Sequence, residues 1–315
     1  MRVHIEVRTL LRRAAGFAAA AAMSLYLLVK LVWIAAEVWQ GTARWVLLNA
    51  ITVVMALAGV ALGLALAQSW GTRLPDWLVL PIVWVCGGLL VSMIPYMIAA
   101  GLVAPSAPEP AATTPAWEGV LIGVGFAGMA VALVVGLPLF LRERWPRAFV
   151  GRVGRQRVDG RFLWALPPLG VLAATWACWA AGGSYGLLTG WDIQGRLLMA
   201  DSALCAAGAG WSLWALSPWG SGRTRVWPAM AVGFVASGSL FSWGAWRLVW
   251  LVAGMYQPVE LRGVAVVEHG VAMGAGLAVL LTLLRAYGRR SEPGVRLFRC
   301  TCASSSSGGA PGPES

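Results

Sequence analysis

Eight long apolar runs alternate with short polar segments along the chain. A membrane-spanning helix needs about 20 mostly apolar residues in a row, and each run is close to that length or longer. The runs are continuously apolar rather than alternating, so they predict helices and not β-strands. The predicted helices are Ala14–Ala36, Val46–Ser69, Trp77–Val103, Glu118–Leu141, Phe162–Gly182, Leu197–Pro218, Trp227–Gly254 and Val264–Leu284. The pattern predicts an all-α integral membrane protein with eight transmembrane helices.

The composition excludes an ordinary soluble domain. Of the 315 residues, 59% are hydrophobic and only 12% are charged, whereas soluble domains carry about 25% charged residues. The net charge of +11 is compatible with nucleic-acid binding when taken alone. However, the basic residues lie in short loops between apolar runs and not on one face of a soluble domain. The expected partner is therefore the lipid bilayer, and no nucleic acid is expected.

The arginines predict the orientation, because cytoplasmic loops are enriched in basic residues. Lys30 and Arg247 lie inside predicted helices, and Arg44, Arg196 and Arg262 lie in loops on one side. All the other residues of the 24 Lys and Arg lie on the opposite side. We therefore expect a multi-pass protein in the plasma membrane of a bacterium, with both termini in the cytoplasm.

Three regions follow from this topology. Residues 1–13 form a cytoplasmic N-terminal segment, residues 14–287 form the membrane domain, and residues 288–315, which contain a serine run, form a disordered cytoplasmic tail. The largest inner loop, Arg142–Arg161, is strongly basic and is expected to attract anionic lipids. Docking of an acidic protein partner is the alternative for this loop, and the sequence leaves the oligomeric state open.

The two halves of the membrane domain, about 14–141 and 160–287, share sequence features at a spacing near 150 residues. Glu118-Gly119-Val120 opens the fourth helix and Glu268-His269-Gly270-Val271 opens the eighth, with one extra residue in the second copy. Upstream pairs are Leu47-Leu48 with Leu197-Leu198, Trp70-Gly71 with Trp219-Gly220, Gly88 with Gly238, Ser92 with Ser242 and, more weakly, Trp33–Ala36 with Trp179–Gly182. Each half contains an even number of helices, so the pattern predicts two tandem four-helix repeats in parallel orientation. Coincidence in a background rich in Ala, Leu, Gly and Trp is the alternative.

Two further motifs carry a resemblance. The unit Trp70-Gly71-Thr72-Arg73-Leu74-Pro75-Asp76-Trp77 and the Trp179–Gly183 unit resemble uncharacterised actinobacterial multi-pass integral membrane proteins. Abundant Ala, Gly and Trp, together with a single lysine, fit such a source. The resemblance implies a multi-pass topology and brings no activity, cofactor or site residue with it.

Ionisable side chains inside the predicted helices are the candidate site, because charge in the hydrocarbon region is costly and usually functional. All of them lie toward the predicted outer side, which suggests one polar vestibule open to the outside. Lys30 and Arg247 are available there as counter-charges to the acids. The alternative is that these side chains extend to the outer head groups. The candidate residues are Lys30, Glu118, Asp201, Arg247, Glu268 and His269.

Other motifs indicate packing rather than chemistry. Gly119/Gly123 and Gly270/Gly274 are small-xxx-small pairs, which predict close helix contacts. The sequence has no Walker loop and no H-E-x-x-H motif, and its only histidines are His4 and His269. It therefore predicts no catalytic residue, no cofactor and no metal site. The tail cysteines Cys300 and Cys302 are a metal or redox pair only if a second pair accompanies them, and none does.

Three functions remain open from the sequence. A small transporter or solute-binding membrane protein is favoured by the repeat and by the outer charges. A non-catalytic membrane scaffold or accessory subunit is the alternative, and it is favoured by the lack of a recognisable site. An intramembrane enzyme that uses Glu118, Glu268 and His269 as acid and base is the third. Convergence of the charged residues on one cavity distinguishes the first and third from the second.

Overall fold

The computed structural model describes residues 2–40, 43–103, 116–151, 160–217, 219–220, 225–254 and 258–291. Within these ranges the regular structure is helical, apart from one isolated β-bridge between Leu187 and Glu260. The prediction of an all-α multi-pass membrane protein is confirmed. Residues 104–115 and the tail cysteines Cys300 and Cys302 lie outside the described residues.

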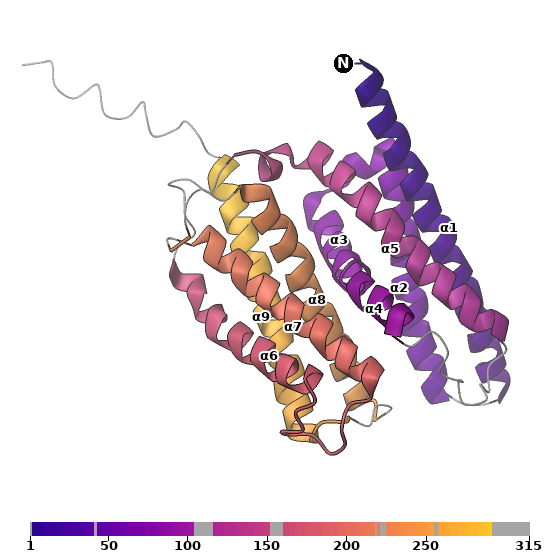
Figure 1. The fold of residues 1–315 in the computed structure, drawn as a ribbon. Coiled ribbons are helices and arrows are strands. Elements are labelled where there is room, and N and C mark those ends of the chain that lie inside the picture. Colours follow the sequence, from indigo (N-terminus) through magenta and orange to yellow (C-terminus); the bar gives the residue numbers. More distant parts are fainter. Residues whose placement is uncertain are drawn as a thin grey trace, which may run out of the picture.

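The helices form two bundles that stand side by side (Figure 1). The N-terminal bundle contains α1 (Arg2–Gln40), α2 (Ala43–Ala67), the short 3₁₀ helix η1 (Ser69–Thr72), α3 (Asp76–Leu90), α4 (Ile94–Val103) and α5 (Ala116–Arg144). Two further 3₁₀ helices, η2 (Pro146–Phe149) and η3 (Gly160–Ala165), lie in the connection to the second bundle. That bundle contains α6 (Leu166–Ala180), α7 (Ile193–Leu216), α8 (Val226–Val252) and α9 (Arg262–Ser291).

Seven helical segments of the described chain are long and apolar enough to cross a membrane, with α3 and α4 together forming one of them. The remaining predicted span, Leu197–Pro218, corresponds to α7, which has 24 residues but carries Arg196 and Asp201 and is less apolar. It packs between α6 and α8, and α1 begins at the same end of the molecule at which α9 ends (Figure 1). This arrangement agrees with an even number of crossings. That α7 is a full span stays a prediction.

The third predicted helix is broken near its middle. α3 ends at Leu90 and α4 begins at Ile94, next to Pro95, which has no backbone N–H to donate to the carbonyl group four residues earlier. The Val91 carbonyl oxygen, which Pro95 leaves without its donor, accepts from the Ile94 N–H at 3.3 Å, and the Ser92 hydroxyl group donates to the Gly88 carbonyl oxygen. This span is therefore interrupted, whereas α8 is one continuous helix of 27 residues.

Each bundle has its own hydrophobic core. The first is built around Met129, Leu133 and Phe140, and the second around Leu169, Trp179 and Leu283. The bundles join chiefly where α3 crosses α8. There a Cβ added at Gly88 would lie 2.1 Å from the carbonyl carbon of Gly238. Two glycines are therefore required for the backbones to approach so closely.

The contact between Gly88 and Gly238 bears on the predicted duplication. These residues are matched in the two repeats, and at a two-fold interface equivalent residues meet one another near the axis. The packing within the bundles differs, however, because α5 packs mainly against α1, whereas α9 packs mainly against α8. The duplication stays a prediction.

Several predicted boundaries shift. The N-terminal segment 1–13 is not separate, because α1 begins at Arg2, and Arg12 is 5% exposed and donates to the Leu66 carbonyl oxygen at 2.9 Å. At the other end, α9 extends to Ser291, so residues 288–291 of the predicted tail are helical. The predicted inner loop begins within α5, whose last residue is Arg144.

The predicted small-xxx-small contacts are wrong. A Cβ added at Gly119, Gly123, Gly270 or Gly274 meets nothing within 4 Å, so these four glycines lie on open faces of α5 and α9. Close packing instead occurs between Gly16 of α1 and Gly63 of α2, and between Gly88 and Gly238.

Large apolar side chains cover the outside of both bundles. Leu10, Val54, Val171 and Val267 are each more than 60% exposed, which a soluble protein would avoid over so wide an area. Many exposed tryptophans lie at helix ends, as expected for the membrane–water interface: Trp39, Trp77, Trp117, Trp219 and Trp227. The outer surface of the helices is therefore suited to contact with the lipid bilayer.

Candidate functional site

The six candidate residues fall into two groups, one in each bundle. Asp201, Arg247, Glu268 and His269 line a single pocket in the C-terminal bundle. Lys30 and Glu118 belong to polar contacts among α1, α2 and α5, and they are not among the lining residues of that pocket. Four of the six candidate residues therefore share one small pocket, and a vestibule open to the outside stays a prediction.

The pocket lies toward the end of the bundle where α7 and α9 begin and α8 ends. Asp201 comes from α7, Arg247 from α8, and Glu268 and His269 from α9. The pocket volume is about 40 Å³. A site of this size has room for about three water molecules or one small ion.

Glu268 is a buried acid of the pocket. It is 6% exposed, and neither of its carboxylate oxygens accepts a hydrogen bond of normal geometry from the described residues. The nearest ion-pair partner is His269, whose Nδ1 lies 3.4 Å from Oε1, while Trp176 and Arg247 interact with the carboxylate as well. Since buried polar groups are normally satisfied, this carboxylate is suited to a bound cation or water.

His269 is a second side chain of the pocket with a hydrogen-bonding atom that has no partner among the described residues. The residue is 8% exposed, and its Nε2 atom also has no hydrogen-bond partner among the described residues. The imidazole follows Glu268 directly in the chain, so one turn of α9 brings both groups to the pocket. An acid and an imidazole side by side provide a path on which a proton can be held and passed on.

The pocket includes one acid that the sequence analysis missed. Glu260 lies in the connection before α9, is 1% exposed and lines the pocket. The isolated bridge between Glu260 and Leu187 ties this connection to the one after α6, and Leu261 N–H donates to the Gly186 carbonyl oxygen at 2.9 Å. These two connections come together beside the pocket. Glu260 lies outside the apolar runs, so a search of the runs alone does not find it.

Smaller groups complete the lining. Ser202 and Cys205 come from α7, and Ser239 and Trp243 come from α8. The Ser202 hydroxyl group donates to the Leu198 carbonyl oxygen at 2.9 Å. The Trp243 Nε1 atom has no hydrogen-bond partner among the described residues and is an additional donor at the pocket.

The polar contacts of the N-terminal bundle are connected. Lys30 Nζ donates to Asn49 Oδ1 at 3.0 Å, and Asn49 Nδ2 donates to Glu37 Oε1 at 2.8 Å. The Lys30 ammonium group also lies 3.9 Å from the centroid of the Trp33 ring, a favourable cation–π distance. This cluster holds α1 against α2. The Lys30 ammonium group therefore has its partners inside the protein.

Glu118 joins the same region from α5. It is 7% exposed, and its Oε2 atom accepts a hydrogen bond from Trp33 Nε1 at 2.8 Å. Glu118 and Glu268 are both buried within the protein. An indole donates to Glu118, whereas an imidazole lies beside Glu268, whose carboxylate also interacts with Arg247, one of the two expected counter-charges.

The chemistry of the C-terminal pocket is that of a small, mainly acidic site. Three carboxylates, one guanidinium and one imidazole share its lining. No group of three or more His, Cys, Asp and Glu in the part of the chain that the structure describes has the geometry to hold a metal ion. The arrangement is suited to binding a small cation or to holding protons.

Comparison of the chain with protein-family models, with curated proteins and with solved structures found no match.

Proposed function

We propose that this membrane protein binds and moves a small monovalent cation, with the pocket among α7, α8 and α9 as its site. A proton is favoured over a metal ion, because no group of three or more His, Cys, Asp and Glu among the described residues has the geometry to hold a metal ion. In the proposed topology both termini are cytoplasmic, and the pocket faces the outer side of a bacterial plasma membrane. The proposed parallel repeat of two four-helix units fits a transporter, because such repeats commonly have their sites close to the membrane interior.

One observation carries the proposal: Asp201, Arg247, Glu260, Glu268 and His269 converge on one pocket inside a helical bundle. Burying so many ionisable groups is costly in a membrane. Side chains that serve only to reach the head groups would instead be spread around the bundle surface. The convergence favours a binding site over a scaffold.

The size and charge of the pocket support the choice of ligand. At about 40 Å³, the pocket excludes a sugar or an amino acid, whose sites are typically several hundred Å³. Acidic groups outnumber the guanidinium, so a cation is favoured over an anion. The carboxylate oxygens of Glu268, which accept no hydrogen bond of normal geometry from the described residues, supply negative charge for binding the cation.

Ion flux in proteoliposomes tests the proposal. The purified protein is reconstituted, gradients of Na⁺, K⁺ or H⁺ are imposed, and flux is followed with ion-sensitive dyes. We expect flux for the wild type and a loss of about 100-fold for Glu268→Gln, which corresponds to about 2.7 kcal/mol. Glu118→Gln is the matched control, since Glu118 is buried to the same extent outside the pocket, and it should retain flux.

The outcomes separate transport from scaffolding. Absence of flux for all three ions with a folded wild-type protein, or equal loss for Glu268→Gln and Glu118→Gln, would overturn the proposal. The scaffold alternative is favoured by the paired, internal state of Lys30 and Glu118. It predicts that native mass spectrometry of the purified protein finds a stoichiometric protein partner.

A further inference from the structure

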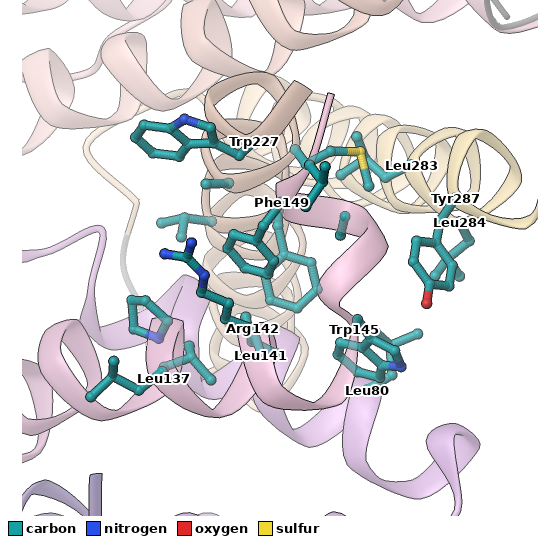
Figure 2. A pocket seen from close by; sticks show the side chains of 18 of the residues that line it. Leu80, Leu137, Leu141, Arg142, Trp145, Phe149, Trp227, Leu283, Leu284 and Tyr287 are labelled. Carbon is teal, nitrogen blue, oxygen red and sulfur yellow. The ribbon is translucent and has the colours of Figure 1, made fainter. Parts of the chain in front are cut away.

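A large cavity lies between the two bundles, at the opposite end from the polar pocket. Its volume is about 1040 Å³, and α3, α5, η2, α8 and α9 contribute to its lining. Figure 2 shows side chains from both bundles facing this space. The two bundles contact one another where α3 crosses α8, beside the cavity. At the cavity itself the two bundles lie apart.

The wall of the cavity is almost entirely apolar. A water-filled passage with such a lining is unfavourable, because the apolar side chains would contact water across a large area, and no row of polar groups replaces the hydration of a solute. Hydrocarbon is therefore the chemically matched occupant. The apolar lining includes Leu80, Leu137, Leu141, Phe149, Leu283 and Leu284.

Two arginines lie at this cavity, one from each bundle. Arg142 belongs to the last turn of α5, and Arg225 immediately precedes α8. Both are exposed, and neither guanidinium group has a hydrogen bond or ion pair with another described residue. In Figure 2 the Arg142 side chain extends from α5 toward Trp227 of α8. Two guanidinium groups that line one cavity suit a phosphate oxyanion, which each can bind with paired N–H donors.

The neighbouring guanidinium group, that of Arg144, already has partners within the protein. Its guanidinium group pairs with Asp76 Oδ1 and also donates to the Gly71 carbonyl oxygen at 2.9 Å and to that of Leu74. Asp76 is the acid among the lining residues, and this pairing neutralises it. The net charge at the cavity is therefore positive.

Aromatic side chains place the cavity at the membrane–water boundary. Trp145, Trp227 and Tyr287 line it, and Trp227 is 46% exposed. Trp and Tyr prefer the depth of the lipid head groups. An occupant at this depth would have its polar group beside the two arginines and its apolar part in the cavity.

We infer that this cavity binds a phospholipid with an anionic head group, with its acyl chains against α3, α5, α8 and α9 and its phosphate between Arg142 and Arg225. A free phosphate would leave the apolar wall uncovered, and a neutral lipid would leave the positive charge uncompensated. Basic pockets between transmembrane helices on the cytoplasmic side bind anionic lipids by the same combination. The inference does not depend on the proposed cation transport.

Native mass spectrometry of the full-length protein from mild detergent tests this inference. The protein is titrated with phosphatidylglycerol and, separately, with phosphatidylcholine of the same acyl chains. We expect one phosphatidylglycerol to be retained and phosphatidylcholine to be lost. Arg142→Gln and Arg225→Gln should each weaken retention about fivefold, and the double variant about 25-fold. Arg73→Gln, an exposed arginine outside the cavity lining, is the matched control and should not change it.

A second variant tests the apolar part. Ala231 is half-buried and lines the cavity, so Ala231→Phe should fill space that the acyl chains need and reduce retention while the arginines are intact. Equal retention of both lipids, or equal weakening by Arg73→Gln, would overturn the inference. So would stabilisation of the protein by glycerol phosphate alone, which would indicate a soluble anion. A dimer without a lipid adduct would overturn it also, because a second copy would then fill the cavity.

Discussion

Substitution of Gly88 by alanine is expected to separate the two bundles. The added Cβ would lie 2.1 Å from the Gly238 carbonyl carbon and 2.5 Å from its Cα. Ordinary contacts begin at 3.4 Å, so the helices must move apart by about 1.3 Å, the difference between 3.4 and 2.1 Å. Both partners are backbone atoms, and no rotamer change relieves the overlap.

The expected cost follows from two contributions. Overpacking of a well-packed contact costs about 1–3 kcal/mol. The displacement also strains the hydrogen bond from Trp84 Nε1 to Ser237 Oγ, which is 2.9 Å long, and such bonds in membrane proteins contribute about 0.6 kcal/mol on average. Gly88→Ala should therefore lower the free energy of unfolding by about 1.6–3.6 kcal/mol.

Unfolding in mixed micelles with increasing denaturing detergent, followed by tryptophan fluorescence, measures this difference. Gly274→Ala is the matched control, because a Cβ at Gly274 meets nothing within 4 Å. It should leave stability unchanged or raise it by about 0.5–1 kcal/mol. If Gly88→Ala and Gly274→Ala unfold at the same detergent fraction, the close crossing of α3 and α8 is refuted.

Three further predictions concern topology and the polar cluster of the N-terminal bundle. A reporter that is active only outside the cell, fused after Ser315, should be silent; strong activity would reverse the topology. Asn49→Leu should destabilise the protein by about 1–3 kcal/mol, because Lys30 loses its acceptor. Asn49→Asp keeps the acceptor for Lys30 but replaces the donor to Glu37 by a second carboxylate, so it should also destabilise the protein in the same unfolding assay. Trp33→Phe should cost about 1–3 kcal/mol by leaving Glu118 without its donor. The double variant with Glu118→Leu should recover much of that loss, and failure to do so would show that the indole contributes chiefly by packing.

The helices were predictable because the bilayer imposes a length on each apolar run. Predicted Val46–Ser69 and Trp227–Gly254 agree closely with α2 and α8. The start of α1 was not predictable in this way. Arg12 was assigned to the cytoplasm by its charge, yet its guanidinium group is buried against the Leu66 carbonyl oxygen. A helix continues beyond the apolar run wherever tertiary contacts satisfy its polar side chains, and hydropathy does not report such contacts.

The site was predictable only in part, for a related reason. Charged residues inside apolar runs are conspicuous, and this feature identified Asp201, Arg247, Glu268 and His269. Glu260 lies in a connection, where an acid is ordinary, and only the bridge to Leu187 brings it to the pocket. The glycine pairs failed because spacing places two glycines on one face of a helix but does not say which face meets a neighbour.

The two matched glutamates have different surroundings. Sequence matching sets Trp33 against Trp179 and Glu118 against Glu268, so comparable groups are available in both bundles. In the first bundle the indole of Trp33 donates to Glu118, and Lys30 lies over that ring. In the second, Trp179 donates instead to the Tyr185 carbonyl oxygen at 2.8 Å, and the carboxylate of Glu268 interacts with Trp176 and Arg247 at the pocket. If the halves arose by duplication, the glutamate has exchanged one indole partner for another and has gained a guanidinium neighbour at a pocket that can accept a ligand.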